Sequence, residues 1–350
     1  MSLNDLINHT SEWLKGSGPN SHIVMSSRVR LARNLEGIPF PNRANKKESQ
    51  NVLKSVKEAI LSIDSLKDAL FLELEQVDSV DKQFLIERHL MSHEHALKPN
   101  NKALVVSNDE VVSIMINEED HLRIQVMRSG FDLDESWRII DNLDDELAKS
   151  LNFAFLSEWG YLTACPTNTG TALRGSVMLH LPALVMTKQI NKILAAIAKL
   201  SFTTRGLYGE GTQASGNFFQ ISNQVSLGHS ETEIFENLKG LIRQVIEQEE
   251  QARQALILQS REIVEDRVWR AYGTLRSSYI ISSEETTELL SMVRLGSDLG
   301  IVKDIDRTFI NELFIITQPA HLQKREGNKL SSSERDYKRA SLIRSKLGGK

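Results

Sequence analysis

The pattern of apolar residues changes at Ser230, and this change constrains the fold more than any other feature of the chain. Between residues 21 and 228, strand-like segments that alternate every two residues are interspersed with segments of helical period. Ser230-Glu-Thr-Glu233 matches a capping box, and the sequence after it follows the helical period. This order predicts an α+β fold in which a mixed domain precedes an all-helical C-terminal domain.

The mixed region lacks the regular strand and helix alternation of a doubly wound parallel sheet, so we expect an antiparallel α+β layer. Residues 101–127 predict an antiparallel meander. Helical periodicity predicts helices at 46–63, 133–151 and 187–200. We divide the chain into a lead-in (1–20), a mixed domain (21–250) and a helical domain (251–350). The stretch 247–262, rich in Gln and Glu, is expected to be an exposed continuation or linker.

Composition limits the function classes. The net charge of −4 over 350 residues argues against non-specific nucleic-acid binding, although residues 321–350 carry nine Lys or Arg against three Asp or Glu. A single cysteine excludes an internal disulfide and favours a reducing, cytoplasmic location. The sequence has no run of 18 or more apolar residues and no signal-peptide pattern, so we expect neither a membrane span nor export.

Arginines in strand-like segments are the most informative polar residues. A period of two places Arg28 and Arg30 on one face of a strand, opposite Val29 and Leu31. In two further strand-like segments, Arg123 and Arg174 likewise lie on the face opposite to the apolar residues. If these strands share a sheet, the guanidinium groups converge and repel unless an anion lies between them, and a polyphosphate is a natural ligand. The alternative is that each arginine lies on an ordinary solvated sheet face.

Two acidic positions lie in loop contexts, the turn 117–121 and Glu210 within the glycine-rich stretch 205–216. That stretch formally fits a dinucleotide-binding pattern, but no strand-to-helix context follows it, so this interpretation fails. The sequence contains no Walker A motif and no protein-kinase motifs, so a nucleotide would be held by side chains. Each acidic position could also be simply solvated.

The histidines and the cysteine give weak signals. His89, His93 and His95 lie close together with Glu94, but they form no H-E-x-x-H motif. A surface histidine cluster explains them better, and we predict no metal site built from side chains. Cys165 has no His and Asp arrangement around it in the sequence, so inert packing is the ordinary interpretation.

Four multi-residue motifs, taken together, resemble a known family. In chain order they are Ser26-Ser-Arg-Val-Arg30, Ile116-Asn-Glu-Glu-Asp-His-Leu-Arg123, Cys165-Pro-Thr-Asn-Thr-Gly-Thr-Ala-Leu-Arg174 and Arg205-Gly-x-x-Gly-Glu210. They resemble the catalytic segments of phosphagen (guanidino) kinases over residues 21–230. The resemblance implies a large antiparallel sheet flanked by helices, and transfer of the γ-phosphoryl group of ATP, with Mg²⁺, to a guanidinium nitrogen.

The same resemblance implies roles for individual residues. Glu119 and Glu210 correspond to the two catalytic carboxylates that orient the guanidinium and take up its proton. Cys165 corresponds to the cysteine beside the guanidino substrate, where it would tune reactivity and could sense redox state. The arginines implied in binding the ATP phosphates are Arg28, Arg30, Arg123, Arg174 and Arg205. Met178 stands where phosphagen kinases have a histidine, so the adenine contacts cannot be carried over directly.

The C-terminal region departs from phosphagen kinases. Those enzymes carry a helical domain before the first arginine motif, whereas Arg28 lies close to the start of this sequence. Arg335-Asp-Tyr-Lys-Arg-Ala340 resembles instead a motif of the bacterial protein arginine kinases, which implies an allosteric phosphoarginine site at Arg335, Asp336, Arg339 and Ala340. Phosphoarginine joins an anionic phosphate to a cationic guanidinium, so Arg and Asp suit its two ends. The alternative is an ordinary basic helix.

Three functions remain in competition. The leading hypothesis is an ATP-dependent kinase that phosphorylates arginine side chains of proteins. The alternatives are a kinase for free arginine or another small guanidino compound, and a non-catalytic adaptor that binds phosphoarginine. The resemblance further suggests a heat-shock transcriptional repressor among the substrates, an activator protein, a Clp protease or unfoldase system downstream, and a homo-oligomer, with no direct binding of nucleic acid or membrane.

Overall fold

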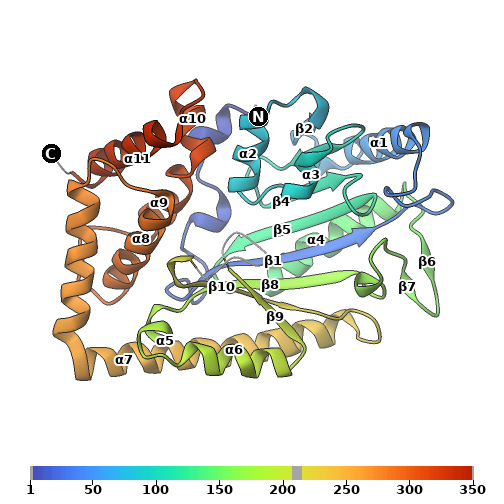
Figure 1. Cartoon of the computed structure of the whole chain (residues 1–350). Coiled ribbons are helices and arrows are strands. Elements are labelled where there is room, and N and C mark those ends of the chain that lie inside the picture. The colour runs from blue at the N-terminus through green and yellow to red at the C-terminus, as the bar shows by residue number, and fades with distance from the viewer. Residues whose placement is uncertain (1–2, 207–214, 349–350) are drawn as a thin grey trace.

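The computed structural model describes residues 3–206 and 215–348. Within these residues, eight strands form one sheet in the order β2-β3-β4-β5-β1-β8-β10-β9, and all neighbouring strands are antiparallel (Figure 1). The strands of this sheet are β1 (Val24–Arg33), β2 (Leu70–Glu73), β3 (Ala103–Val106), β4 (Val112–Ile116), β5 (Leu122–Ser129), β8 (Leu173–His180), β9 (Phe202–Arg205) and β10 (Phe218–Asn223). A separate hairpin pairs β6 (Phe155–Leu156) with β7 (Gly160–Tyr161). The predicted antiparallel α+β fold and the meander over 101–127 are confirmed.

Helices flank the sheet and make up the C-terminal region. They are α1 (Lys46–Leu61), α2 (Ser79–Glu87), α3 (His93–Leu97), α4 (Leu133–Ala148), α5 (Pro182–Met186), α6 (Ile190–Lys199), α7 (Glu231–Ser277), α8 (Ser283–Asp298), α9 (Arg307–Ile316), α10 (Pro319–Glu326) and α11 (Ser332–Leu347). The three helices predicted from periodicity in the mixed region are thus confirmed as α1, α4 and α6. None of the helices in the described ranges combines the length and the apolar run that crossing a membrane requires.

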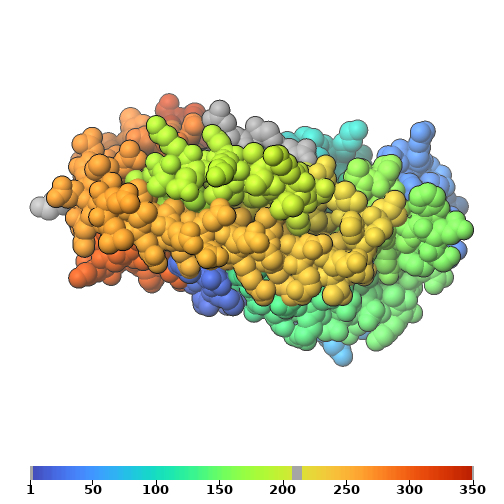
Figure 2. All heavy atoms as spheres, turned by 90° about the horizontal axis from the view of Figure 1, so that it is seen from below, coloured from blue at the N-terminus to red at the C-terminus, as the bar shows by residue number. Residues whose placement is uncertain are grey.

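Helix α7 connects the two regions without a break at residue 250. It begins at the predicted capping box, in which the Ser230 side chain accepts a hydrogen bond from the Glu233 backbone N–H. In Figure 2 it runs along one face of the molecule, where α5 packs against it. The stretch 247–262 was expected to be an exposed continuation or linker, and it is a helical continuation of α7 with one exposed side. Its other side is not exposed, because Glu249 is fully buried and accepts hydrogen bonds from the N–H groups of Ala183 and Leu184. Since this helix crosses residue 250, the predicted domain boundary stays a prediction.

The two faces of the sheet are covered differently. On one face, apolar side chains such as Val29 and Leu31 form a continuous core with α1, α4 and α7. The opposite face carries two smaller apolar clusters. In one, α2 packs over β3 and β4; in the other, the C-terminal helices pack over Met127, Met178 and Phe218. The strip between these clusters is the part of the sheet that carries the arginines.

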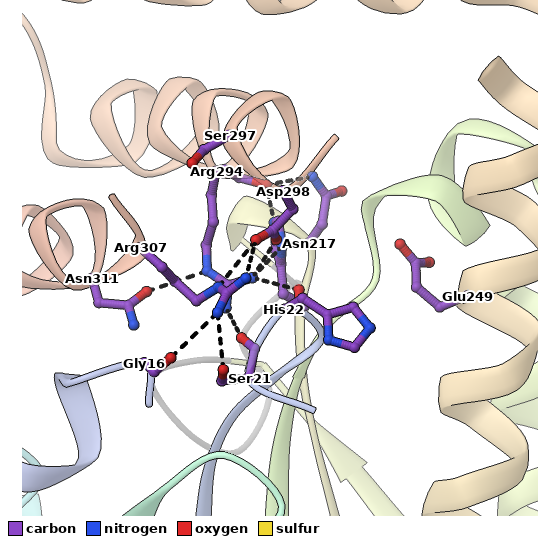
Figure 3. A network of polar contacts seen from close by, with 12 residues as sticks. Gly16, Ser21, His22, Asn217, Glu249, Arg294, Ser297, Asp298, Arg307 and Asn311 are labelled. Carbon is purple, nitrogen blue, oxygen red and sulfur yellow. Dashed lines mark hydrogen bonds and ion pairs between the residues drawn. The ribbon is translucent and has the colours of Figure 1, made fainter. Parts of the chain in front are cut away.

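A buried polar network joins the C-terminal helices to the sheet (Figure 3). Arg294 on α8 is fully buried, and its guanidinium donates to the backbone oxygens of Ser21 and His22 and to Nδ1 of His180 at the end of β8. Asp298, one helical turn further, pairs with Arg307 of α9 at 2.8 Å. Because a buried charge without its partners is costly, these contacts fix how the helices sit on the sheet.

Candidate active site

The arginines predicted from the two-residue period lie on one face of neighbouring strands. In the β1 and β8 pairing Arg30 lies directly opposite Arg174, and in the β1 and β5 pairing Arg123 lies opposite Ala32, two residues further along the same face. Gln220 of β10 pairs with Met178 of β8 on one side and with Arg205 of β9 on the other. Arg205 therefore lies on the same face of the sheet. The antiparallel register therefore brings the predicted arginines of four strands together.

Crowding and burial make this face strongly electropositive. Burial, followed by the charges of Arg123, Arg174 and Arg205, lowers the pKa of Arg28 to about 9. Burial, followed by the charges of Arg123, Arg28 and Arg174, lowers the pKa of Arg30 well below its ordinary value, although Glu118 opposes this. The buried Nε of Arg30 has no hydrogen-bond partner among the described residues. Such an arrangement is unfavourable by itself and becomes favourable when an anion binds, which is what a polyphosphate site requires.

Individual arginines are held in place by neighbouring polar groups. Nη1 of Arg123 lies 2.8 Å from both carboxylate oxygens of Glu118, and Ser92 Oγ donates to the same carboxylate at 2.7 Å. Although burial works in the opposite direction, Arg123 and these hydrogen bonds lower the pKa of Glu118 to about 2, so it stays ionised. Arg174 donates at 2.9 Å to the hydroxyls of Ser222 and Thr203. Glu118 was not among the predicted site residues, and the sequence marks it only by its position beside Glu119.

Glu119 lies on the turn between β4 and β5, with its side chain exposed at the end of the arginine face. The pKa of Glu119 is raised overall. Partial burial and then the carboxylates of Asp120 and Glu118 raise it, and the charges of Arg123 and Arg30 offset only part of this rise. A carboxylate with a raised pKa is a better proton acceptor than an ordinary one. Glu210, the predicted partner of Glu119, lies outside the described residues.

A buried hydrogen-bond network ties the Glu119 turn to the Cys165 segment. Asp120 Oδ1 accepts from the backbone N–H of Ala164 at 2.7 Å and from Asn34 Nδ2 at 2.6 Å, while Asn34 Oδ1 accepts from the His121 backbone at 2.9 Å. Because Asp120 follows Glu119 and Ala164 precedes Cys165, these two predicted site residues are brought close together. Cys165 is half-buried, and its Sγ lies 3.1 Å from Thr167 Oγ1.

A small pocket lies next to Arg28. Its lining consists of Trp13, Ser26, Arg28, His89, Met127, Ser176, Met178 and Gln220. The rings of Trp13 and His89 meet edge to face with centroids 5.3 Å apart, and the buried Trp13 Nε1 has no partner within the described chain. Two rings, two methionine thioethers and a nearby cluster of guanidinium groups suit a flat base joined to phosphates.

The prediction that His89, His93 and His95 form a cluster on the surface is wrong. Burial, then the charge of Arg28, lowers the pKa of His89 to about 4, so its imidazole is neutral in the pocket wall. His95 is fully buried, with Nε2 3.0 Å from the backbone oxygen of Ala103. Only His93 of the three is exposed. In the described part of the chain, no group of three or more His, Cys, Asp or Glu side chains is arranged to hold a metal ion.

The C-terminal motif lies on α11, which starts at the predicted capping box of Ser331 and Glu334. Arg335 and Asp336 are half-exposed. Arg339 is buried instead, where it donates to the backbone oxygens of Thr317 at 2.8 Å and Ile281 at 2.9 Å and pairs with Asp336 at 2.5 Å. Ala340 is buried as well. The motif therefore presents Arg335 and Asp336 outward, and Arg339 braces α11 against the starts of α8 and α10.

Comparisons with known proteins fit this geometry. A family model described as "ATP:guanido phosphotransferase, C-terminal catalytic domain" matches residues 51–252, more than half of the chain. The chain belongs to the ATP:guanido phosphotransferase family. A second model, described as "Protein-arginine kinase McsB C-terminal domain", matches residues 261–350. Both resemblances expected from the motifs are thereby confirmed.

Relatives place the chain more closely within the ATP:guanido phosphotransferase family. The "Protein-arginine kinase" of Halothermothrix orenii is 50% identical over 348 residues, which cover 99% of each chain. The "Protein-arginine kinase" of Moorella thermoacetica is 47% identical over 352 residues, and this alignment covers 100% of each chain. Among solved structures, lombricine kinase matches with a TM-score of 0.60 and 25% identity over 69% of each chain. The duplicated taurocyamine kinase of Schistosoma mansoni, with bound transition-state analogue components, matches with a TM-score of 0.59 and 27% identity over 64% of this chain and 32% of that one.

Proposed function

We propose that this chain is an ATP-dependent protein arginine kinase that transfers the γ-phosphoryl group of ATP to arginine side chains of proteins. One observation carries the proposal: arginines from four strands converge on one sheet face, and that face ends at the turn that carries Glu119. The full-length relatives named protein-arginine kinase support the choice of a protein as acceptor.

The arginine face would hold the phosphates. We assign Arg28, Arg30, Arg123, Arg174 and Arg205 to the nucleotide phosphates, where bidentate guanidinium contacts spread the negative charge of a loose transition state. Mg²⁺, bound by the phosphates, would neutralise further charge on the oxygens being transferred. The pocket lined by Trp13, His89 and Met178 would hold the base. The fit rests on the buried, unpaired Nε of Arg30 and on the lowered pKa of Arg28.

The carboxylates would prepare the acceptor. A guanidinium is protonated at every physiological pH and is a poor nucleophile until a carboxylate orients it and takes up a proton. Glu119, with its raised pKa, is suited to this step at the end of the arginine face. We assign Glu210 as the second carboxylate from the family motif, and Cys165 as a residue beside the acceptor nitrogen that tunes its reactivity. The Asp120 network supports placing Cys165 near Glu119.

The C-terminal region would add recognition. We propose that Arg335 and Asp336 bind the phosphate and the guanidinium of phosphoarginine, with Arg339 and Ala340 forming the floor beneath them. The partners implied by the family resemblance are a heat-shock transcriptional repressor as one substrate, an activator protein, a Clp protease or unfoldase system that receives the products, and a second copy of the chain, all within the cytoplasm.

One experiment separates the competing functions. The purified protein is incubated with Mg²⁺ and ATP labelled at the γ-phosphate, with either an unfolded arginine-rich protein or free arginine, and acid-labile phosphate is counted. A protein arginine kinase labels the protein and leaves most free arginine unlabelled. Fast, saturable labelling of free arginine alone would establish the metabolite kinase instead. Binding of phosphoarginine without any transfer would leave only the adaptor.

A further inference from the structure

Three consecutive residues at the end of α2 connect three separate parts of the molecule. Glu87 contacts the C-terminal helix α10, Arg88 contacts the N-terminal lead-in, and His89 lines the pocket assigned to the nucleotide base. The first two contacts lie outside the arginine face and the Glu119 turn, so phosphoryl transfer makes no direct use of them. Their arrangement couples the shape of the base pocket to helices that lie beyond the sheet.

The contact of Glu87 with α10 is buried and dense. Its carboxylate accepts from the backbone N–H groups of Ala320 at 2.8 Å and His321 at 3.1 Å, and from Nδ1 of His321 at 2.8 Å. Burial lowers the pKa of His321, so the imidazole is neutral and its Nδ1–H donates to the carboxylate. The ring of His321 also lies against Phe84 of α2, with centroids 4.4 Å apart. Separating α2 from α10 would break these three hydrogen bonds and the ring contact together.

Arg88 holds the lead-in against the same turn. Its guanidinium pairs with the buried Glu110 and donates to the backbone oxygen of His9 and to Ser11 Oγ at 2.8 Å. Two residues after Ser11, Trp13 enters the pocket wall and meets the ring of His89. The two rings of the pocket are therefore positioned from both sides of the α2 end.

His89 has little freedom to adjust independently. Its backbone takes a left-handed conformation (φ 59°), which is strained for a residue with a side chain, and its N–H bonds to the Ile86 oxygen. A shift of Glu87 relative to α10 would therefore move the His89 ring directly, because only Arg88 separates them.

We propose that Glu87, through its buried contact with α10, is a positioning residue for nucleotide binding: the C-terminal helices hold the His89 side of the base pocket in shape. This proposal rests on the proposed function, since it takes the pocket as the site of the base. Glu87 itself touches no substrate. It sets the affinity for the base and leaves the phosphate contacts of the arginine face unchanged.

The test compares two ligands in the full-length protein. Calorimetry measures the binding of ATP and of inorganic tripolyphosphate, each with Mg²⁺, to the wild type, to Glu87→Gln and to His321→Leu. We expect ATP binding to weaken about tenfold in both variants, while tripolyphosphate binding stays unchanged because it needs only the arginines. In turnover assays, the KM for ATP rises by the same factor and kcat at saturating ATP is retained.

Two further variants separate positioning from a general loss of structure. His321→Asn keeps a donor near the position of Nδ1 and should restore most of the ATP affinity, whereas Glu94→Gln, an exposed carboxylate on the neighbouring α3, should change neither ligand. Equal loss of ATP and tripolyphosphate binding, or unchanged ATP binding in Glu87→Gln, would overturn the proposal. A wild type that binds neither ligand would overturn the proposed function itself.

Discussion

Removing one arginine from the crowded face should make the ligand-free protein more stable while it destroys function. The change is Arg28→Met, which keeps a long side chain next to Met127 and Met178 in the pocket wall. The matched control is Arg43→Met, an exposed arginine in the loop before α1. Because the charges of Arg123, Arg174 and Arg205 oppose that of Arg28, removing its charge relieves repulsion as well as the cost of burial.

The size of the effect follows from the lowered pKa. A fall from 12.5 to about 9 corresponds, at about 1.4 kcal/mol per pKa unit, to roughly 5 kcal/mol acting against the folded state at neutral pH. The folded protein holds this pKa below its unfolded value, so the cost is present at neutral pH and is relieved only as the pH rises through about 9. Relaxation and solvent reduce the recoverable part, because replacing buried ion pairs by apolar residues of similar volume returns at most about 1–4 kcal/mol.

Thermal unfolding without ligand measures the gain, which we expect as a rise of about 2–6 °C in the midpoint for Arg28→Met and none for Arg43→Met. Added Mg²⁺ and tripolyphosphate should raise the midpoint of the wild type and of Arg43→Met, and should raise that of Arg28→Met far less. The reasoning is refuted if ligand-free Arg28→Met unfolds at a lower temperature than the wild type, since the arginine would then be a net stabiliser.

Two further predictions concern the acceptor site and the tail. Asp120→Asn removes a carboxylate that raises the pKa of Glu119, so the acidic limb of the pH profile of kcat/KM should move to lower pH, and a limb that stays in place would contradict the assigned coupling. Arg335→Ala and Asp336→Ala should each weaken the binding of free phosphoarginine by tenfold or more in calorimetry, with ATP binding unchanged, because each removes one end of a two-ended charge match. Equal affinity in all three proteins would reduce the motif to a solvated helix.

Much of the fold follows from the local pattern. The strands β1 and β5, the helices α1, α4 and α6, and the two capping boxes are specified by periodicity and by short motifs, so the sequence predicts them. From the sequence, we could predict that the arginines converge only if their strands belong to the same sheet. The register that places Arg30 opposite Arg174 depends on long-range pairing, which a single sequence does not show.

Burial is the property that the sequence predicted least well. His95, Glu249 and Arg339 have polar neighbours in the sequence, which is typical of exposed segments. In the structure each is buried, with hydrogen-bond partners far along the chain or on a neighbouring element. Trp13 gave no signal because its partner His89 lies in another segment. Polar residues are buried only where the tertiary fold supplies their partners, and that information is not local.

The most direct test of the central claim measures phosphoarginine formation by Glu119→Gln. An unfolded arginine-rich protein is incubated with ATP and Mg²⁺, and phosphoarginine is counted by mass spectrometry for the wild type and the variant, with ATP affinity measured on the same samples. If Glu119 orients the acceptor guanidinium and takes its proton, turnover falls by about 10² or more while ATP affinity is retained. Near-normal phosphorylation by Glu119→Gln, with ATP bound as tightly as before, would contradict the account.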